Sequence, residues 1–474
     1  MIGILSILNN RLNSQQFNLR RDKWLVFYTF LAIFAPPFLP VAFVYVLGLL
    51  SIIWLYYNYK TKIAKRILIQ SKIYMMCKFF ACVILYIVVV GLLDMMLIET
   101  RNVMSTRIAS LNQAMNLTLL EFCFVWVILI QCYKRHYELI DIFLLIIFAG
   151  LLQGCCAIIA FCVPQMRTLF LTFSDRTLYT NAYILERRGY GFSINLIDTF
   201  GYGMGLIASY MLFFRWSKSK WLLVCSVLLI LFTIIVNART GIAVFGMGIL
   251  INFLLKANIW RSMARVIVIF ILFEISLPLM IAFLGDLRKS NNDTVAWVAF
   301  GTQQMLMLVS GDDSDIPRMG VEDVSFFDNF IEPPTNTFEY LFGTGHHVYD
   351  TQKTMGFRTD IGYLNLLWEF GIIGSAIVLL VIGIFIIGPF FMTKNLIIRK
   401  ISLLNFIAYM VVLMKAILIG CNPGVVINYL ATFSLYYIIN KERGRIGAPV
   451  PSAKTLTKTE TDGNSPIVNR NTGV

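Results

Sequence analysis

The sequence predicts an all-α polytopic membrane protein, and three observations support this fold class. The chain has 474 residues, of which 58% are hydrophobic and only 14% charged, and its mean hydropathy is +0.74. The apolar residues come in repeated runs of roughly 17–25, the length a helix needs to cross a bilayer core of about 30 Å. Basic residues gather in the short segments between these runs.

These runs give about twelve candidate membrane-spanning segments. The first two are interrupted by Pro36, Pro37 and Pro40, which favours either a tight hairpin or one broken span. A polar and basic stretch, 9–23, precedes them without a small-residue cleavage site, so we expect no cleaved signal peptide. The expected spans are 24–37, 38–57, 73–98, 117–133, 141–163, 194–214, 221–236, 241–255, 266–284, 361–388, 401–419 and 424–440.

The distribution of Lys and Arg predicts which side of the membrane each connecting segment faces. Cytoplasmic loops of membrane proteins are enriched in these residues. If the N-terminus is cytoplasmic, seven alternate segments are inside, and they hold 27 of the 40 basic residues. Both termini are then expected in the cytoplasm, and the net charge of +14 needs no nucleic-acid partner. The inside segments are 1–23, 58–78, 134–140, 215–220, 256–265, 394–400 and 441–474.

Two segments on the opposite side, 164–193 and 285–359, are too long to be simple connections. The second carries twelve acidic residues up to Asp360, and its apolar stretches 295–309 and 326–342 favour an ordered cap over the outer face. The expected division of the chain is N-terminal transmembrane helices in 1–284, a large periplasmic loop in 285–360, C-terminal transmembrane helices in 361–440 and a disordered cytoplasmic tail in 441–474.

The stretch 343–374, GTGHHVYDTQKTMGFRTDIGYLNLLWEFGIIG, concentrates polar chemistry where this loop enters a membrane helix. It holds His346, His347, Arg358, Asp360 and Glu369. Neighbouring histidines rarely point to one centre, and no cysteines with metal-ligand spacing accompany them, so we expect no metal site.

Ionisable residues within predicted spans are costly and are functional candidates. Most of them are expected near the outer surface, where such side chains can also simply extend to water. Their clustering on one side favours an outer polar site over a path through the membrane. They are Asp94 at the end of the third span, Glu121, Asp198 and Glu369 at the start of the fourth, sixth and tenth, and Lys415 near the outer end of the eleventh, while Glu274 alone is expected near mid-membrane.

Arg239 lies in the four-residue turn between the seventh and eighth spans, at the expected level of the outer lipid headgroups. A guanidinium there can bind phosphate through two parallel hydrogen bonds, although it could also serve only as an interfacial anchor. Arg187 and Arg188 are similarly placed before the sixth span. The outer face thus combines arginines with a carboxylate-rich loop, which suits a ligand with a diphosphate at the membrane and sugar hydroxyls above it.

The run 231–250, LFTIIVNARTGIAVFGMGIL, resembles the arginine-bearing helical hairpin of the O-antigen polymerase and ligase superfamily. Arg187-Arg188-Gly189, followed by Asn195 and Ala208, is loosely similar to a second arginine element of that family. The stretch 343–374 resembles its closing motif, a Gly-x-Gly turn before a Leu-rich helix with Glu and GxxG.

This resemblance implies a GT-C-like, metal-independent membrane glycosyltransferase of lipopolysaccharide biosynthesis. It would need no cofactor, and it would act on polyprenyl-diphosphate-linked oligosaccharides at the periplasmic side of the bacterial inner membrane. Arg239 and Arg187 or Arg188 would match the phosphate-binding arginines. Ligases of the family carry a histidine where this chain has Asp360, which favours a polymerase. A chain-length regulator protein is a candidate partner.

The expected chemistry follows from the residue types. Arginines would stabilise the leaving diphosphate, and Asp360, or next His347 or His346, would accept the proton of the attacking hydroxyl. Glu369, with Arg358 and Tyr363, would orient the base or bind sugar. The alternatives are an O-antigen ligase and, in a different class, a flippase for lipid-linked oligosaccharides. Against the flippase, the two halves of the chain show no obvious repeat, and transporters place their polar sites near the midplane.

Overall fold

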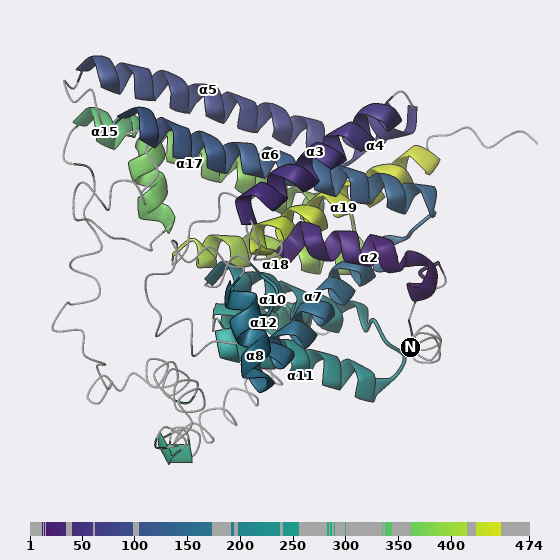
Figure 1. The fold of residues 1–474 in the computed structure, drawn as a ribbon. Helices are drawn as coiled ribbons and strands as arrows, with labels where there is room; N and C mark the ends of the chain where they lie inside the picture. The colour runs from purple at the N-terminus through teal and green to yellow at the C-terminus, as the bar shows by residue number, and fades with distance from the viewer. Residues whose placement is uncertain are drawn as a thin grey trace, which may run out of the picture.

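A computed structural model shows an almost entirely helical chain (Figure 1). It describes residues 12, 14, 16–34, 40–59, 62–97, 104–172, 191–193, 198–237, 240–255, 282–283, 285–286, 289, 299, 334, 337–343, 362–414 and 423–446. The helices are α2 (Leu19–Phe34), α3 (Pro40–Tyr59), α4 (Lys62–Gln70), α5 (Ile73–Leu97), α6 (Met104–Lys134), α7 (Leu139–Cys162), α8 (Pro164–Thr172), α10 (Asp198–Phe214), α11 (Lys220–Asn237), α12 (Thr240–Leu254), α15 (Thr337–Phe342), α17 (Gly362–Met392), α18 (Leu396–Val412) and α19 (Pro423–Ile446).

The all-α membrane class is confirmed by the length and composition of these helices. Within the described residues, α5, α6, α7, α11 and α17 are long and apolar enough to cross a membrane. Three further apolar segments, in α3, α10 and α12, are somewhat shorter. Eleven of the expected spans coincide with described helices, and the remaining one, 266–284, lies almost wholly outside the described residues.

Two helices, α10 and α19, form the centre of the bundle. Nearly every described side chain along them is buried, and α10 packs against α7, α11, α12, α18 and α19. Polar side chains join these helices inside the bundle. The Tyr210 hydroxyl donates to Asn405 Oδ1 at 2.7 Å, and Asn428 on α19 donates to the Tyr202 hydroxyl. Satisfied polar pairs of this kind fix how neighbouring helices align along their axes.

The outer surface of the bundle is apolar where a soluble protein would be polar. Leu50 on α3, Leu85 on α5, Leu228 on α11 and Leu380 on α17 are all more than half exposed. Large contiguous apolar surfaces on a monomer mark contact with another apolar phase. Together with the buried centre, this pattern fits helices whose outward faces meet lipid tails.

Three details differ from the sequence-based expectations or refine them. The proline-interrupted pair forms two helices rather than one broken span: α2 packs mainly on α7 and α3 on α6, and the Tyr28 hydroxyl of α2 lies 2.8 Å from Ser51 Oγ of α3. Helix α6 begins at Met104, earlier than the expected span, but its membrane-length apolar window is Leu117–Lys134, so Glu121 lies near the start of that window as expected. Its side chain does not extend to water but is fully buried. Of the expected helical stretches in the large loop, the structure describes a helix only for Thr337–Phe342.

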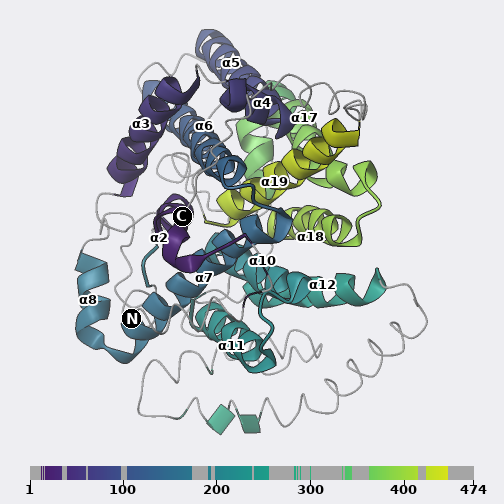
Figure 2. The ribbon, with the colours of Figure 1, turned by 90° about the vertical axis from the view of Figure 1, so that its right-hand side faces the viewer.

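The described parts of the segments predicted to be inside meet at one end of the bundle, the end seen face-on in Figure 2. Arg135 binds Asp22 at 2.6 Å, and Asn440 Nδ2 donates to the Gln70 carbonyl at 2.7 Å. We call this the basic end. Further contacts there join Leu12 to Ser217, Lys134 to Asn58, Lys400 to Asn252 and Arg443 to Met392.

Asp22 is the carboxylate that anchors the basic end. Its side chain is fully buried and accepts hydrogen bonds from Arg21 Nε at 2.9 Å, Arg135 at 2.6 Å and the backbone N–H of Asn18 at 2.9 Å. Burial raises the pKa of Asp22, but the hydrogen bonds from Arg21 and Asn18 outweigh it, so the pKa lies below its usual value. The carboxylate therefore stays charged and satisfies two arginines.

Candidate functional site

The two ends of the polar stretch 343–374 meet at a crossing of two glycines at the other end of the bundle. Gly343 directly follows α15, and Gly371 lies inside α17. A Cβ added at Gly343 would lie 2.5 Å from Glu369 O, and one added at Gly371 would lie 2.4 Å from Gly343 N. Both residues also have positive φ, 84° and 65°, which favours glycine. Only glycine at both positions allows the two backbones to approach this closely.

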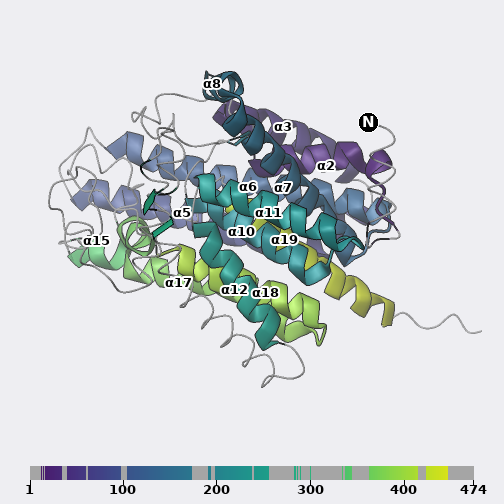
Figure 3. The same cartoon turned by 90° about the horizontal axis from the view of Figure 1, so that it is seen from below.

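Gly371 turns α17 into two helical pieces joined at a corner. Ser375 Oγ donates to Leu366 O at 2.6 Å, nine residues earlier in the chain. Nine residues of straight helix rise about 13.5 Å, so this contact requires a sharp bend between them. The piece from Gly362 to Phe370 therefore folds back against the longer membrane piece. Figures 1 and 3 show α15 beside the start of α17.

Tyr86 on α5 satisfies backbone carbonyls that the crossing leaves outside regular helix. Its hydroxyl lies 2.8 Å from Phe342 O, at the end of α15, and 3.0 Å from Phe370 O, just before the corner. Irregular backbone is tolerated at membrane depth only where protein groups satisfy it. Gly374 leaves room for this tyrosine, because a Cβ there would lie 3.0 Å from the hydroxyl oxygen. We call Gly343, Gly371, Gly374 and Tyr86 the glycine clasp.

The short piece of α17 places buried polar side chains next to the glycine clasp. Glu369 and Asn365 are both essentially inaccessible to water, on a helix that is otherwise strongly apolar. A carboxylate inside a membrane helix is costly and marks a functional candidate. Glu369 is also two residues from the corner, so the clasp fixes its position relative to α15.

Tyr363 ties the beginning of α17 to the end of α18. Its backbone N–H donates to Leu413 O at 3.2 Å, and its hydroxyl donates to Met410 O at 2.6 Å. The hydroxyl can still accept a hydrogen bond, so the expected substrate-binding role of Tyr363 stays a prediction. The same contacts anchor the chain immediately after the segment that carries Arg358 and Asp360.

The helical hairpin that carries Arg239 is held by close packing against α10. Arg239 itself lies outside the described residues, and Asn237 and Thr240 flank it. A Cβ added at Gly205 of α10 would lie 2.5 Å from Gly241 O, so α12 begins in direct backbone contact with α10. Small residues permit such close helix approach in membranes.

The chain that follows Arg187 and Arg188 is docked on α7. The Phe192 N–H donates to Gln153 Oε1 at 3.1 Å, and a Cβ added at Gly191 would lie 2.8 Å from Ala157 N. Both arginines lie outside the described residues. Since α7 and α12 both pack on α10, the described neighbours of the two arginine elements stand on helices that share α10 as a neighbour.

The predicted site residues fall mostly outside the described part of the chain. Among them the structure describes only Glu369 and Tyr363, which share the first piece of α17 and stand beside the glycine clasp. The predicted catalytic and binding residues that lie outside the described residues are Arg187, Arg188, Arg239, His346, His347, Arg358 and Asp360. Lys415 and Glu274 lie outside them as well, and the side chains of Asp94 and Asp198 are not described.

Among the described residues, no group of three or more His, Cys, Asp or Glu side chains could hold a metal ion. His346 and His347 lie outside that search. The expectation of a metal-independent site therefore stays a prediction.

Comparison of the chain with protein-family models, curated proteins and solved structures finds no match. The resemblance to the O-antigen polymerase and ligase superfamily therefore stays a sequence-based prediction.

Sequence reasoning missed Tyr86 altogether. It lies in an unbroken apolar run without a neighbouring polar motif, and its hydrogen-bond partners are more than 250 positions away in the chain. The glycines were noticed as a turn and a GxxG pattern, but their mutual contact depends on tertiary structure. A tyrosine in an otherwise apolar span was the available signal, because a buried hydroxyl needs a hydrogen-bond partner.

Proposed function

We propose that the protein is a membrane-embedded glycosyltransferase that polymerises polyprenyl-diphosphate-linked oligosaccharide repeat units. The glycine clasp is the observation that carries this proposal. It fastens the end of the large extramembrane segment to the membrane helix α17, directly beside the buried Glu369. The segment 344–361, with two histidines, an arginine and Asp360, thus begins and ends at fixed points close to a membrane carboxylate.

This arrangement fits a substrate that is half lipid and half sugar. The apolar outer surface would hold the polyprenyl tail in the bilayer, and the end of the bundle opposite the basic end would meet the diphosphate and the sugars. An enzyme that joins such substrates must bring a water-exposed polar loop to the membrane surface and hold it there. The clasp supplies that attachment, and Tyr363 and Leu413 supply another at the start of α17.

In the proposed reaction, a sugar hydroxyl of one lipid-linked unit attacks the anomeric carbon of another chain. A carbon–oxygen bond to the acceptor forms, and the bond to the polyprenyl diphosphate breaks. Asp360, or His347 or His346 in its place, takes the hydroxyl proton. Arg239 with Arg187 or Arg188 would stabilise the charge of the departing diphosphate, and Glu369 and Arg358 would orient the sugar and the base.

Surface glycan made by living cells tests the proposal and separates it from its rivals. Cells with Arg239→Lys at the wild-type protein level should make glycan of a single repeat unit, while lipid-linked precursor accumulates on the periplasmic side. Lysine keeps the charge of arginine but loses its planar pair of donors.

Other outcomes would identify another function. Precursor trapped on the cytoplasmic side would identify a flippase. Long polymer that remains on the lipid carrier and is missing from the surface acceptor would identify a ligase. Wild-type chain lengths would remove Arg239 from the reaction.

A further inference from the structure

The helix α4 at the basic end presents a charged face that no part of the proposed reaction uses. Its outward residues are Lys62, Lys65, Arg66 and Ile69, all exposed, while Ala64 and Ile67 are fully buried against the bundle. Residues three and four apart share one helical face, so the three cations form a single cluster. From residue 24 to 93 the sequence contains no Asp or Glu, so no carboxylate on this part of the chain neutralises them.

The cluster stands on a rigid support. Trp126 Nε1 of α6 donates to Ala64 O at 3.1 Å, and Asn440 of α19 donates to Gln70 O at 2.7 Å. Ser71 Oγ closes the end of the helix by donating to Ile67 O at 2.8 Å. Both ends of α4 are therefore held, with the buried face fixed inward and the basic face fixed outward.

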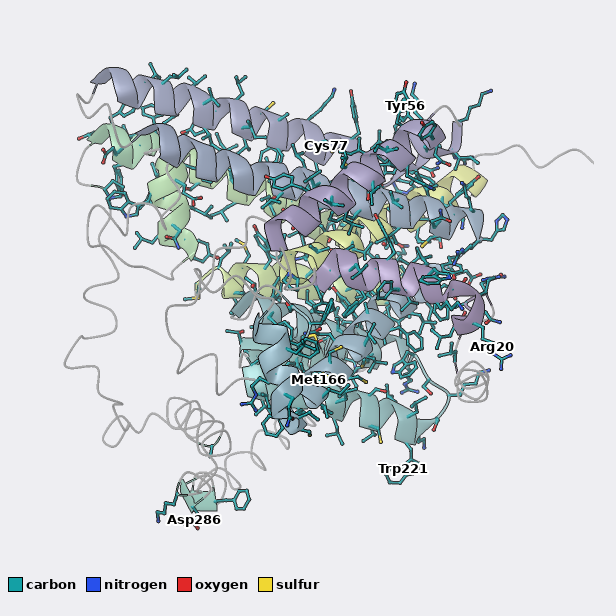
Figure 4. All side chains as sticks on the ribbon, viewed as in Figure 1. Arg20, Tyr56, Cys77, Met166, Trp221 and Asp286 are labelled. Carbon is teal, nitrogen blue, oxygen red and sulfur yellow. The ribbon has the colours of Figure 1, made fainter. Side chains whose placement is uncertain are left out.

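The surroundings of α4 identify the kind of partner. Tyr56 and Tyr57, at the end of α3, are 71% and 74% exposed, and Figure 4 shows Tyr56 projecting from the surface. Tyrosines with an apolar body and a polar tip gather at membrane interfaces. Exposed Leu49 and Leu50 continue the same surface along α3 into the apolar face of the bundle. The basic face thus borders a surface suited to lipid tails. An acidic protein partner would not require such an apolar surface.

We propose that the outward face of α4 binds the headgroups of anionic phospholipids. Lys62, Lys65 and Arg66 would contact the lipid phosphates, with Arg66 able to donate two parallel hydrogen bonds. Ile69, Tyr56 and Tyr57 would lie at the boundary between headgroups and acyl chains. An amphipathic basic helix at this level is attracted both by apolar burial and by negative surface charge. The inference concerns the end of the bundle away from the glycine clasp and does not depend on the proposed reaction.

Lipid binding by the purified full-length protein in detergent tests the inference. Phosphatidylglycerol and phosphatidylcholine would each be titrated and the bound lipids counted by native mass spectrometry. The wild type should prefer phosphatidylglycerol. Each basic residue near a lipid surface contributes about fivefold in affinity, so Lys65→Gln with Arg66→Gln should weaken phosphatidylglycerol binding by roughly 30-fold. Both side chains are exposed, so the fold should be unaffected, which circular dichroism would check.

Lys218→Gln with Lys220→Gln is the matched control, because it removes the same charge from exposed positions at the basic end. It should change phosphatidylglycerol binding by less than about threefold. Equal losses in the two double variants, unchanged binding in the α4 variant, or no preference between the two lipids would each overturn the proposal. Displacement of the lipid by millimolar inorganic phosphate would also overturn it, because it would indicate a site for free anions.

Discussion

Individual residues decide where the two halves of the candidate site join. Gly343 and Gly371 meet backbone to backbone with positive φ, so each position excludes a side chain for two separate reasons. Gly246 on α12 is the opposite case, since a Cβ there would meet nothing within 4 Å. This contrast gives a direct test of the clasp.

Replacement of Gly371 by alanine should destabilise the protein. Gly371 has φ 65° and ψ −179°, a backbone conformation essentially restricted to glycine that costs a residue with a Cβ about 1–3 kcal/mol, and the added atom would lie 2.4 Å from the carbonyl of Leu341. Thermal unfolding of the purified protein in detergent should show a clear loss. Gly246→Ala should be neutral or slightly stabilising, since alanine is the better helix former. Similar unfolding temperatures for the two variants would contradict the crossing.

A second test at the residue scale concerns Asp22 at the basic end. Its folded pKa is lower than the ordinary aspartate value of 3.8, so its carboxylate contributes stability that is complete above that value and is lost as pH falls through the folded pKa. Asp22→Asn should cost about 1–3 kcal/mol at neutral pH, because two arginines lose a buried charged acceptor. The difference between variant and wild type should shrink as the solution is acidified.

Asp286→Asn is the control for this experiment. Asp286 pairs with Lys289 at 3.7 Å, and both side chains are more than 80% exposed. Surface pairs of this kind contribute little. If denaturation curves of Asp22→Asn and Asp286→Asn matched at neutral pH, Asp22 would have no anchoring role.

At the scale of the elements, α17 links the membrane bundle to the candidate site. Its corner at Gly371 leaves backbone carbonyls that α5 must satisfy through Tyr86. At its other end, the Tyr436 hydroxyl donates to Phe385 O at 3.0 Å. These two tyrosines make the same kind of contact to the same helix, one beside the clasp and one far from it.

Tyr86→Phe and Tyr436→Phe should therefore have similar effects on stability and different effects on activity. Each variant loses a hydroxyl bonded to a carbonyl of α17, at a net cost of about 0.5–1.5 kcal/mol. Only Tyr86→Phe removes the hydrogen bonds that join α5 to the end of α15 and to the corner, so only that variant should shorten glycan chains in cells. Equal chain lengths in the two strains, at matched protein levels, would show that the Tyr86 contact is structural alone.

The sequence was sufficient to predict most of these elements, because apolar runs of membrane length report directly on helices. Sequence-based prediction failed where a feature depends on tertiary contacts. The start of α6 at Met104 was missed because 104–116 is too polar to look like part of a span. The different packing partners of α2 and α3 depend on tertiary structure, and the role of Tyr86 depends on carbonyls from distant elements. In the candidate site, the burial of Glu369 was not predicted. Its position near the start of an expected span, close to the large loop, suggested that its side chain would reach water.

At the scale of the whole molecule, the chain has two unlike ends. One gathers the segments rich in Lys and Arg, and the other holds the glycine clasp and the termini of α15, α17 and α18. The positive-inside rule predicts that the basic end is cytoplasmic, which would make the proposed site periplasmic.

Labelling of introduced cysteines tests this orientation. In a background without the native cysteines, Tyr340→Cys on α15 should react with a membrane-impermeant thiol reagent in intact spheroplasts. Lys218→Cys, at the basic end, should react only after the membrane is permeabilised. Both positions are exposed, so access depends on the side of the membrane. The reverse pattern would place the clasp in the cytoplasm and remove the periplasmic site.

The most direct measurement is the size of the products that the purified protein makes from one defined polyprenyl-diphosphate-linked repeat unit, with a metal chelator present. We predict a ladder of lipid-linked polymers, undiminished by the chelator, since arginines rather than a bound cation would stabilise the leaving diphosphate. Arg239→Lys should lower the rate by about 10²–10³. A ladder that needs added Mg²⁺ or Mn²⁺ would contradict the proposed mechanism, and a substrate recovered at its original size would contradict polymerisation itself.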